Sequence, residues 1–544
     1  LPVVGVTSEG GSAIRLRQAG QHSAELDLAE LGYVDHSSDL ESYVAGPAVL
    51  LGHSAPAPAA WDSRRDQTGS ATLATADSAF VGARGSWYPN CALSTPAEYD
   101  LIFHYPEDLR LVATGTRVEG NTSAGWKQSH WRCRGVYRVA GFNLGPYRSA
   151  ERTIGDTRIE VFATPEAEAA LEKRHAAMQP LQPVGPSIGR PTRDMPLEVM
   201  RRPAPPLSPS DLLESVAENA AGAVEYFEKL FGPFPYPQLS IAQVPGNFGQ
   251  GWPGLVYLPT LSFLPKTARI ELGVGGRSGD LSGRCFVAHE VAHQWWGNLL
   301  GWETYHDQWL SEGLASYAAA LYLARQKEGD RQVHELLRTY KQDLLAKNKS
   351  GATVESDGPI WLGWRLSNSL HPDGYNTIAY KKACWVLHML RGVLAGTGTD
   401  GDQRFLGMLR EFIAAHRGQT VSTEDFIHQA EKYMPRDSDL EHNHRLDWFF
   451  DEWVYGTGVP TYRIESCVRS VGPQKYVVEG KIEQSDVGED FEMLVPVVAN
   501  YDGNKRVVLG RVAVGSSGGK FRFTTPKKPT HVSIDEDNLL AVVH

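Results

Sequence analysis

The sequence predicts a multidomain α+β protein with strand-rich ends and a mainly helical middle. Two observations support this class. A chain of 544 residues is too long for one hydrophobic core. Short apolar runs bounded by glycine, proline and asparagine occur in residues 1–177 and again after residue 460, whereas apolar positions at helical spacing dominate between residues 210 and 460. We therefore expect β, α and β parts in that order.

Residues 1–177 are predicted to form a β-rich N-terminal domain. Residues 99–106, 111–115 and 157–163 are its clearest strand-like runs. Residues 178–209 then form a proline-rich segment, which contains Pro180, Pro183, Pro186, Pro191, Pro196, Pro203, Pro205, Pro206 and Pro209. Because proline at this density blocks helix interiors and central strands, we predict an extended linker or surface excursion there.

The helical pattern begins after the linker and defines a predicted domain at residues 210–460. Its first stripe of apolar residues has helical spacing and consists of Leu212, Leu213, Val216, Ala220, Val224, Phe227 and Leu230. Residues 239–244 look like a strand, and helical segments dominate from residue 283 to residue 454. Residues 461–544 return to strand-like runs such as 475–479 and 507–509, which suit a C-terminal β-sandwich.

Composition and charge exclude several classes of protein. The net charge of −11 argues against a nucleic-acid partner. No apolar stretch approaches the ~18–20 residues of a transmembrane helix, so we expect no transmembrane segment. The five cysteines are few and contain no CxxC pair, which indicates neither a disulfide scaffold nor a cysteine metal site.

The chain starts with Leu1, and we slightly favour an exported location, periplasmic or extracellular, over the cytoplasm. The oligomeric state is left open.

The strongest local signal is the H-E-x-x-H pattern of His289, Glu290 and His293. Apolar residues around it make a helix plausible, and positions four apart lie on one helix face, so both imidazoles can reach one metal ion. Zinc in a hydrolase takes three protein ligands and leaves a fourth position for water. Two histidines therefore need a third ligand from elsewhere in the chain.

Glu312 is the predicted third ligand of a single zinc ion. It lies at the start of a second helical stretch, for which Asp307 is a reasonable N-cap. The segment between His293 and Glu312 is long enough for the first helix to end, turn, and be followed by a second helix. Glu290 is not needed as a ligand. It is predicted to be the general base that takes a proton from zinc-bound water, whose pKa zinc lowers towards ~7.

At these residues the chain resembles the gluzincin aminopeptidases, the family of aminopeptidase N and leukotriene hydrolase. Residues 309–315 resemble the family's W-L-N-E-G-F-A block, and residues 379–383 resemble its V-Y-E-K-G block. Residues 449–460 look like the end of its catalytic domain, and residues 86–89 and 99–115 like pieces of its first domain.

The resemblance implies a thermolysin-like zinc catalytic domain between the two β-rich parts, and a peptide or protein substrate. It also implies that Tyr380 stabilises the oxyanion, since a phenol can donate one hydrogen bond to developing charge. Tyr375 is the alternative candidate for this role, and a packing role for Tyr380 stays open.

The sequence departs from the family at one block. Gluzincin aminopeptidases carry G-x-M-E-N before the zinc motif, and its glutamate binds the free amino group of the substrate. Here the block contains Gly249, Gln250, Gly251 and Trp252, with no charged residue between 249 and 254. A buried ammonium needs an anionic partner, so amine recognition must differ. We hypothesise that these four residues still line the substrate cleft. The alternative is that they form only a tight structural turn.

Three functions follow from these observations. The leading one is a zinc metallopeptidase of the aminopeptidase type. The second is an endopeptidase, a glycopeptidase-like enzyme or an unusual exopeptidase that does not require a free N-terminus, which the missing glutamate suggests. The third is an inactive binding or scaffold protein. The complete set of His289, Glu290, His293, Glu312 and Tyr380 argues against the third.

Overall fold

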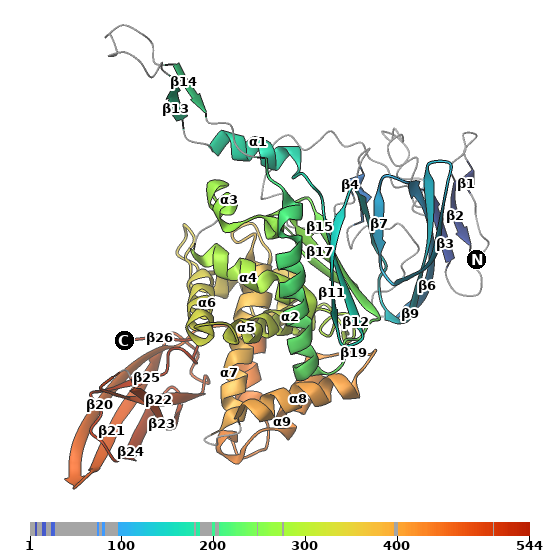
Figure 1. Ribbon diagram of the computed structural model, residues 1–544. Helices are drawn as coiled ribbons and strands as arrows, with labels where there is room; N and C mark the ends of the chain where they lie inside the picture. Colours follow the sequence, from blue (N-terminus) through green and yellow to red (C-terminus); the bar gives the residue numbers. More distant parts are fainter. Residues whose placement is uncertain are drawn as a thin grey trace, which may run out of the picture. The chain divides into compact units, whose positions relative to one another are not determined.

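The computed structural model describes residues 6–7, 13–17, 23–27, 73–74, 79–81, 96–178, 181–184, 198–201, 206–246, 248–274, 277–396, 401–503 and 505–544. The chain divides into two compact units, residues 1–226 with 234–294 and residues 227–233 with 295–544. Figure 1 shows strands in the blue and cyan part, helices in much of the middle, and strands again at the red end. The predicted α+β class with strand-rich ends is confirmed. The predicted domain boundaries stay predictions.

Two sheets of the first unit come from its early strands. The six-stranded sheet has the order β1 (Val6–Thr7), β2 (Ala13–Arg17), β3 (Ser23–Asp27), β6 (Ala97–Pro106), β9 (Trp126–Tyr137) and β8 (Thr116–Ser123). The four-stranded sheet has the order β4 (Leu73–Ala74), β5 (Ala79–Phe80), β10 (Phe142–Gly145) and β7 (Arg110–Ala113). The predicted strands at 99–106 and 111–115 are confirmed as β6 and most of β7. Residues 86–89 lie outside the described residues.

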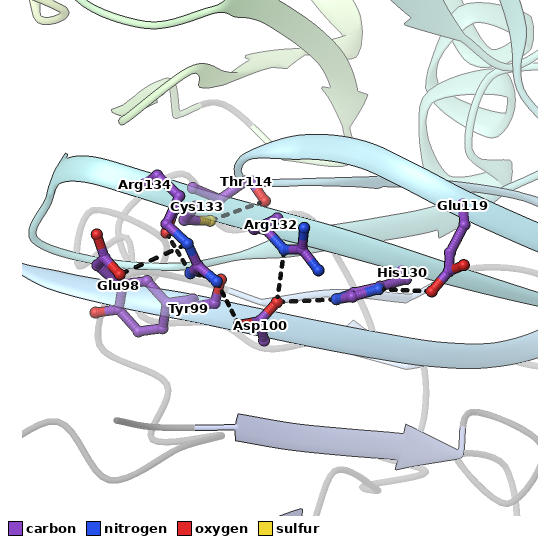
Figure 2. Close-up of polar contacts among 9 residues, drawn as sticks. All are labelled: Glu98, Tyr99, Asp100, Thr114, Glu119, His130, Arg132, Cys133 and Arg134. Carbon is purple, nitrogen blue, oxygen red and sulfur yellow. Dashed lines mark hydrogen bonds and ion pairs between the residues drawn. The ribbon is translucent and has the colours of Figure 1, made fainter. Parts of the chain in front are cut away.

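Side chains of β6 alternate between a buried and a more exposed face, as a strand with one covered face requires. On the more exposed face, Asp100 accepts hydrogen bonds from Arg132 Nε at 3.1 Å and Arg134 Nη2 at 2.7 Å (Figure 2). His130 connects Asp100 to Glu119, with N···O distances of 2.9 and 3.0 Å. Burial opposes ionisation of Asp100, but the bonds from Arg134, His130 and Arg132 outweigh it and lower its pKa to about 2. This network joins β6 to β8 and β9.

A five-stranded sheet forms the centre of the first unit. Its order is β11 (Arg148–Ile154), β12 (Thr157–Ala163), β15 (Gln238–Val244), β17 (Leu255–Pro259) and β16 (Gln250–Trp252). The β12–β15 and β15–β17 pairs are parallel, and β16 is an antiparallel edge strand beside β17. β15 is buried along almost its whole length, as expected of a central strand. The strands predicted at 157–163 and 239–244 are both confirmed.

Helices precede, connect and follow these strands. They are α1 (Ala169–Met178), η2 (Pro209–Leu212), α2 (Leu213–Phe231), η3 (Thr260–Phe263), α3 (Lys266–Glu271) and α4 (Arg277–Ala292). The apolar stripe predicted after residue 210 is confirmed as α2. Within the proline-rich segment, β13 (Leu181–Val184) pairs with β14 (Glu198–Arg201) as an antiparallel hairpin. The rest of that predicted linker, at 179–180, 185–197 and 202–205, lies outside the described residues.

The second unit begins with helices and ends with strands. Its helical elements are α5 (Trp309–Ala324), α6 (Gly329–Leu344), η4 (Val354–Asp357), η5 (Ile360–Leu366), η6 (Asn376–Lys382), α7 (Ala383–Ala395), α8 (Gly401–Ala415), α9 (Thr423–Lys432), η7 (Arg436–Ser438), α10 (Asp447–Phe450) and η8 (Asp451–Tyr455). Two short strands, β18 (Gly301–Trp302) and β19 (Thr420–Val421), pair in parallel. Trp295 and Trp296 pack against Phe231.

Two sheets close the second unit. The first has the order β24 (Gly519–Thr525), β21 (Lys475–Ser485), β20 (Thr461–Gly472) and β26 (Val542–Val543), and the second has the order β23 (Lys505–Val514), β22 (Met493–Tyr501) and β25 (His531–Ile534). The strand-like runs predicted after residue 460 are confirmed in β21 and β23. Across the described part of the chain, no helix has the length and apolar character needed to span a bilayer.

Candidate metal centre

The H-E-x-x-H residues lie at the C-terminal end of α4. His289 and Glu290 belong to its last turn, and the backbone N–H of His293 donates to His289 O at 3.2 Å, so the helical turn continues past Ala292. This geometry places the two imidazoles on one face, with their Nε2 atoms 3.1 Å apart. The predicted helix around the motif ends at Ala292, and hydrogen-bonded turns follow it.

The two histidines and Glu312 together form a candidate metal site. One ligand atom from each of His289, His293 and Glu312 can be chosen so that all three lie within 4.8 Å of one another. Among the residues that the structure describes, no other group of three histidine, cysteine or acidic side chains meets this test. Two imidazole nitrogens and one carboxylate oxygen are the donor set of hydrolytic zinc sites, so these residues fit the predicted ion.

Glu312 lies in the first turn of α5, but Asp307 is not the N-cap of that helix. The prediction is wrong at this residue, because the N-cap position is occupied by Gln308, which makes no side-chain capping bond. The carboxylate of Asp307 instead accepts bonds from the backbone N–H groups of Thr304, at 3.0 Å, and Thr423, at 2.8 Å. Asp307 therefore connects the segment before α5 to the start of α9.

Two glycines, Gly249 directly before β16 and Gly251 within it, lie directly against the metal-motif residues. A Cβ atom added to Gly249 would lie 2.8 Å from Glu290 Cδ, and one added to Gly251 would lie 2.6 Å from His293 Cβ. Real Cβ atoms essentially never come this close to other heavy atoms. Glycine at both positions therefore allows the edge strand to approach α4, and Glu290 is only 4% exposed as a result of its packing.

Gln294, which the sequence reasoning missed, fixes the chain after β16 to the end of α4. Its side chain accepts from the backbone N–H of Gly254 at 2.8 Å and donates to Trp252 O at 3.0 Å. The amide is fully buried, so both bonds are protected from water. The position of Gln294 directly after His293 is the signal in the sequence that could have pointed to it. Its partners lie 40 and 42 residues away, and the sequence does not identify them.

The four predicted substrate-binding residues have different surroundings. Gly249, Gln250 and Gly251 are partly exposed. Trp252 is 2% exposed and belongs to a hydrophobic core cluster with Leu255 and Tyr257, whose ring lies 5.6 Å from its own. Trp252 thus packs within a core cluster of the central sheet. A substrate-binding role stays a prediction for all four residues.

Tyr380 lies in η6, which is a π-helical segment, and its half-buried ring is 5.6 Å from that of Tyr375. Such segments inside helices are rare and occur often at functional sites. A Cβ atom on Gly313 would lie 2.8 Å from Ala383 Cβ. The first turn of α5, which carries Glu312, is therefore packed closely against the residue that follows η6.

A buried ion pair anchors the same π-helical segment. Lys382 Nζ donates to Glu355 Oε1 at 3.0 Å, and the same oxygen accepts from Gly458 N at 2.7 Å. Lys382 is fully buried, and burial lowers the pKa of its ammonium although Glu355 opposes this effect. The sequence reasoning missed this pair because its members are 27 residues apart.

Three other histidines have partners that are not metal-site residues. His306 stacks on Trp361, His371 Nδ1 lies 2.8 Å from Asp357 Oδ1, and His388 Nε2 lies 2.9 Å from Asn538 Oδ1. Hydrogen bonding and stacking thus account for these three rings without a metal.

Comparison with known proteins finds similarity to peptidases over the part of the chain that holds this site. Residues 278–453 match the model of the peptidase family M1 domain. The chain is 26% identical to aminopeptidase O of Homo sapiens over 253 residues, which cover 42% of this chain and 28% of that protein. It is also 26% identical to leukotriene A-4 hydrolase of Xenopus laevis over 276 residues, covering 49% and 40%. Aminopeptidase B of Mus musculus is 26% identical over 263 residues, covering 46% and 36%.

The matches to these relatives span less than half of their length. Among solved structures, the fold is similar to that of Legionella pneumophila aminopeptidase A in complex with aspartic acid. The TM-score is 0.56 at 16% identity, and the match covers 87% of this chain and 48% of the other. The predicted resemblance to the gluzincin aminopeptidases is thus confirmed, and residues 278–453 are the part of this chain that matches the peptidase family M1 domain.

Proposed function

We propose that this chain is a zinc-dependent peptidase of the aminopeptidase type, with His289, His293 and Glu312 as the ligands of one zinc ion. The observation that carries the proposal is the convergence of two imidazoles and one carboxylate within 4.8 Å, inside the segment that matches peptidase family M1. When bound, zinc supplies a Lewis acid that polarises a carbonyl group and lowers the pKa of a coordinated water towards ~7.

Glu290 is the proposed general base. It is adjacent to a ligand histidine in the sequence, and its carboxylate is buried against Gly249, which limits its motion. A positioned carboxylate can take the proton of an attacking water and deliver it to the leaving amine. Tyr380 is the proposed donor of one hydrogen bond to the oxyanion, and its π-helical segment is anchored through the buried Lys382–Glu355 pair.

A second candidate is a peptidase that does not require a free N-terminus. The uncharged segment between residues 249 and 254 favours this candidate. In the aminopeptidases, the corresponding block holds a glutamate that binds the substrate amine. In the aminopeptidase case, an acid from another element must pair with the substrate ammonium. The proposed substrate is a peptide or protein in both cases. We also favour an exported location over the cytoplasm.

Cleavage of a mixed peptide library by mass spectrometry separates these candidates. The library is offered with free and with acetylated N-termini, Glu290→Gln serves as the blank, and zinc content is measured on both proteins. Stepwise trimming of free N-termini alone supports the aminopeptidase type, whereas cleavage of acetylated peptides supports the second candidate. Bound zinc without any hydrolysis that depends on Glu290 would overturn both, and would leave a binding or scaffold protein.

A further inference from the structure

A cavity of about 330 Å³ lies within the second unit, between α6 and the strands β22, β23 and β25. None of the proposed metal ligands or catalytic residues lines it. Its volume is in the range of small-molecule sites, which is about 300–1,000 Å³. The buried side chains of Trp385 and Ile534 contribute apolar surface to the lining, and charged groups supply much of the rest.

Lys341 of α6 offers an ammonium group to this cavity. Its Nζ donates to Ala541 O at 3.0 Å, and no carboxylate of a described residue lies within 4.0 Å of it. An ammonium has three N–H donors, so two remain for a ligand. Burial lowers the pKa of Lys341, and the neighbouring charge of Glu536 opposes that shift. A partly desolvated cation without an ion-pair partner is the group that an anionic ligand would stabilise.

Glu536 offers the opposite charge in the same lining. Its carboxylate accepts no hydrogen bond and forms no ion pair within the described part of the chain, Lys341 included. Arg506 of the same lining binds both Asp535, at 2.9 Å, and Asp537, at 2.5 Å. Arg338 is exposed and reaches Asp537 only at 3.7 Å. The cavity therefore presents one cation, Lys341, and one carboxylate, Glu536, that are not paired with each other.

We propose that this cavity is a binding site for a small zwitterion of the α-amino acid class, with the ligand carboxylate facing Lys341 and the ligand ammonium facing Glu536. Trp385 and Ile534 provide the apolar surface that a side chain of the ligand would cover. The inference does not rest on the proposed peptidase activity. Should that activity hold, free amino acids would be its products, and the cavity would be a second place where they bind.

Isothermal titration of the full chain with L-leucine tests the proposal. N-acetyl-L-leucine, which lacks the ammonium, and L-leucinamide, which lacks the carboxylate, are titrated in parallel. Lys341→Met and Glu536→Gln each remove one charge, and Lys475→Met and Glu489→Gln are matched controls at exposed positions. Titration of His293→Ala separates this binding from any binding at the metal centre. Arg338→Met is a further variant, because its exposed side chain should tolerate replacement.

We expect saturable binding of L-leucine to the wild type, to both controls and to His293→Ala. Lys341→Met and Glu536→Gln should each weaken it by about tenfold or more, since a hydrogen bond to a charged group contributes about 1.5–3 kcal/mol. Both blocked analogues should bind at least about tenfold more weakly, and Arg338→Met should weaken binding less. Absence of saturable binding, equal affinities in all variants, or full affinity for either blocked analogue would overturn the proposal.

Discussion

A methyl group on Gly251 would lie 2.6 Å from Cβ of His293 and 2.9 Å from the backbone oxygen of Glu290. Gly251→Ala should therefore push the edge strand and the end of α4 apart. We expect zinc affinity to fall at least tenfold, and stability to fall by about 1–3 kcal/mol, which is the usual cost of overpacking. Zinc titration and thermal unfolding of the purified variant measure both quantities.

The matched control for that variant is Gly392→Ala in α7, where an added Cβ meets no atom within 4 Å. Alanine has the higher helix propensity, so this variant should gain up to about 1 kcal/mol of stability and keep the zinc affinity of the wild type. Unchanged zinc affinity in Gly251→Ala would contradict the close packing of the strand on α4.

Zinc should stabilise the fold through its three proposed ligands. A ligand at 100 times its dissociation constant stabilises a folded protein by about 2.7 kcal/mol. We expect zinc to raise the melting temperature of the wild type and a chelator to reverse the rise, whereas His293→Ala should respond to neither. Differential scanning calorimetry with zinc or chelator measures this, and a zinc-dependent rise of similar size in His293→Ala would show that the ligands are elsewhere.

Removal of Lys382 should cost far more than removal of its neighbour Lys381. Lys382→Met leaves the carboxylate of Glu355 buried, with the N–H of Gly458 as its remaining hydrogen-bond donor among the described residues, and breaking a buried pair costs about 3–5 kcal/mol. Lys381 pairs with Asp343 near the surface, so Lys381→Met should cost at most about 1 kcal/mol. Urea unfolding of both variants gives the comparison, and equal losses would mean that the buried pair is not important for stability.

Acid should destabilise the second unit through His388. Burial, followed by the charge of Arg391, lowers the pKa of His388 to about 4, whereas an unfolded histidine titrates near 6.5. The unfolded state binds the proton first, so this contribution is complete above pH ~6.5 and is lost as pH falls towards 4. The loss is at most about 3.4 kcal/mol, at 1.36 kcal/mol for each pKa unit between 6.5 and about 4.

Urea unfolding at pH 7, 5 and 4 should show a smaller pH dependence in His388→Gln than in the wild type. The glutamine amide can still bond to Asn538 but does not titrate in this range. Parallel pH profiles for the two proteins would exclude His388 as the source of the acid sensitivity.

Local patterns predicted most of the regular structure. The run at 157–163 has the same bounds as β12, and the apolar stripe after residue 210 became α2, because each pattern is repeated along a single element. The two metal-motif histidines could be predicted as well, since a spacing of four residues on a helix places both on one face.

Interactions between distant segments could not be predicted in the same way. Asp307 has the residue type of an N-cap, yet its carboxylate accepts hydrogen bonds from Thr304 and Thr423 and does not cap α5. Trp252 next to two glycines suggested a cleft wall, but the pleat of β16 directs its ring into the core of the central sheet. Each outcome depends on a neighbour that sequence spacing does not identify.

The backbone of β16 also restricts how the specificity of this protein can be redesigned. A glutamate introduced at position 251, to imitate the G-x-M-E-N block, would need space that the backbone oxygen of Glu290 and the Cβ atom of His293 already fill. A laboratory seeking a new amine-recognition site would therefore have to rebuild the whole edge strand, or introduce the acid from another segment. A larger side chain at Gly251 would disturb the metal centre before it changed substrate preference.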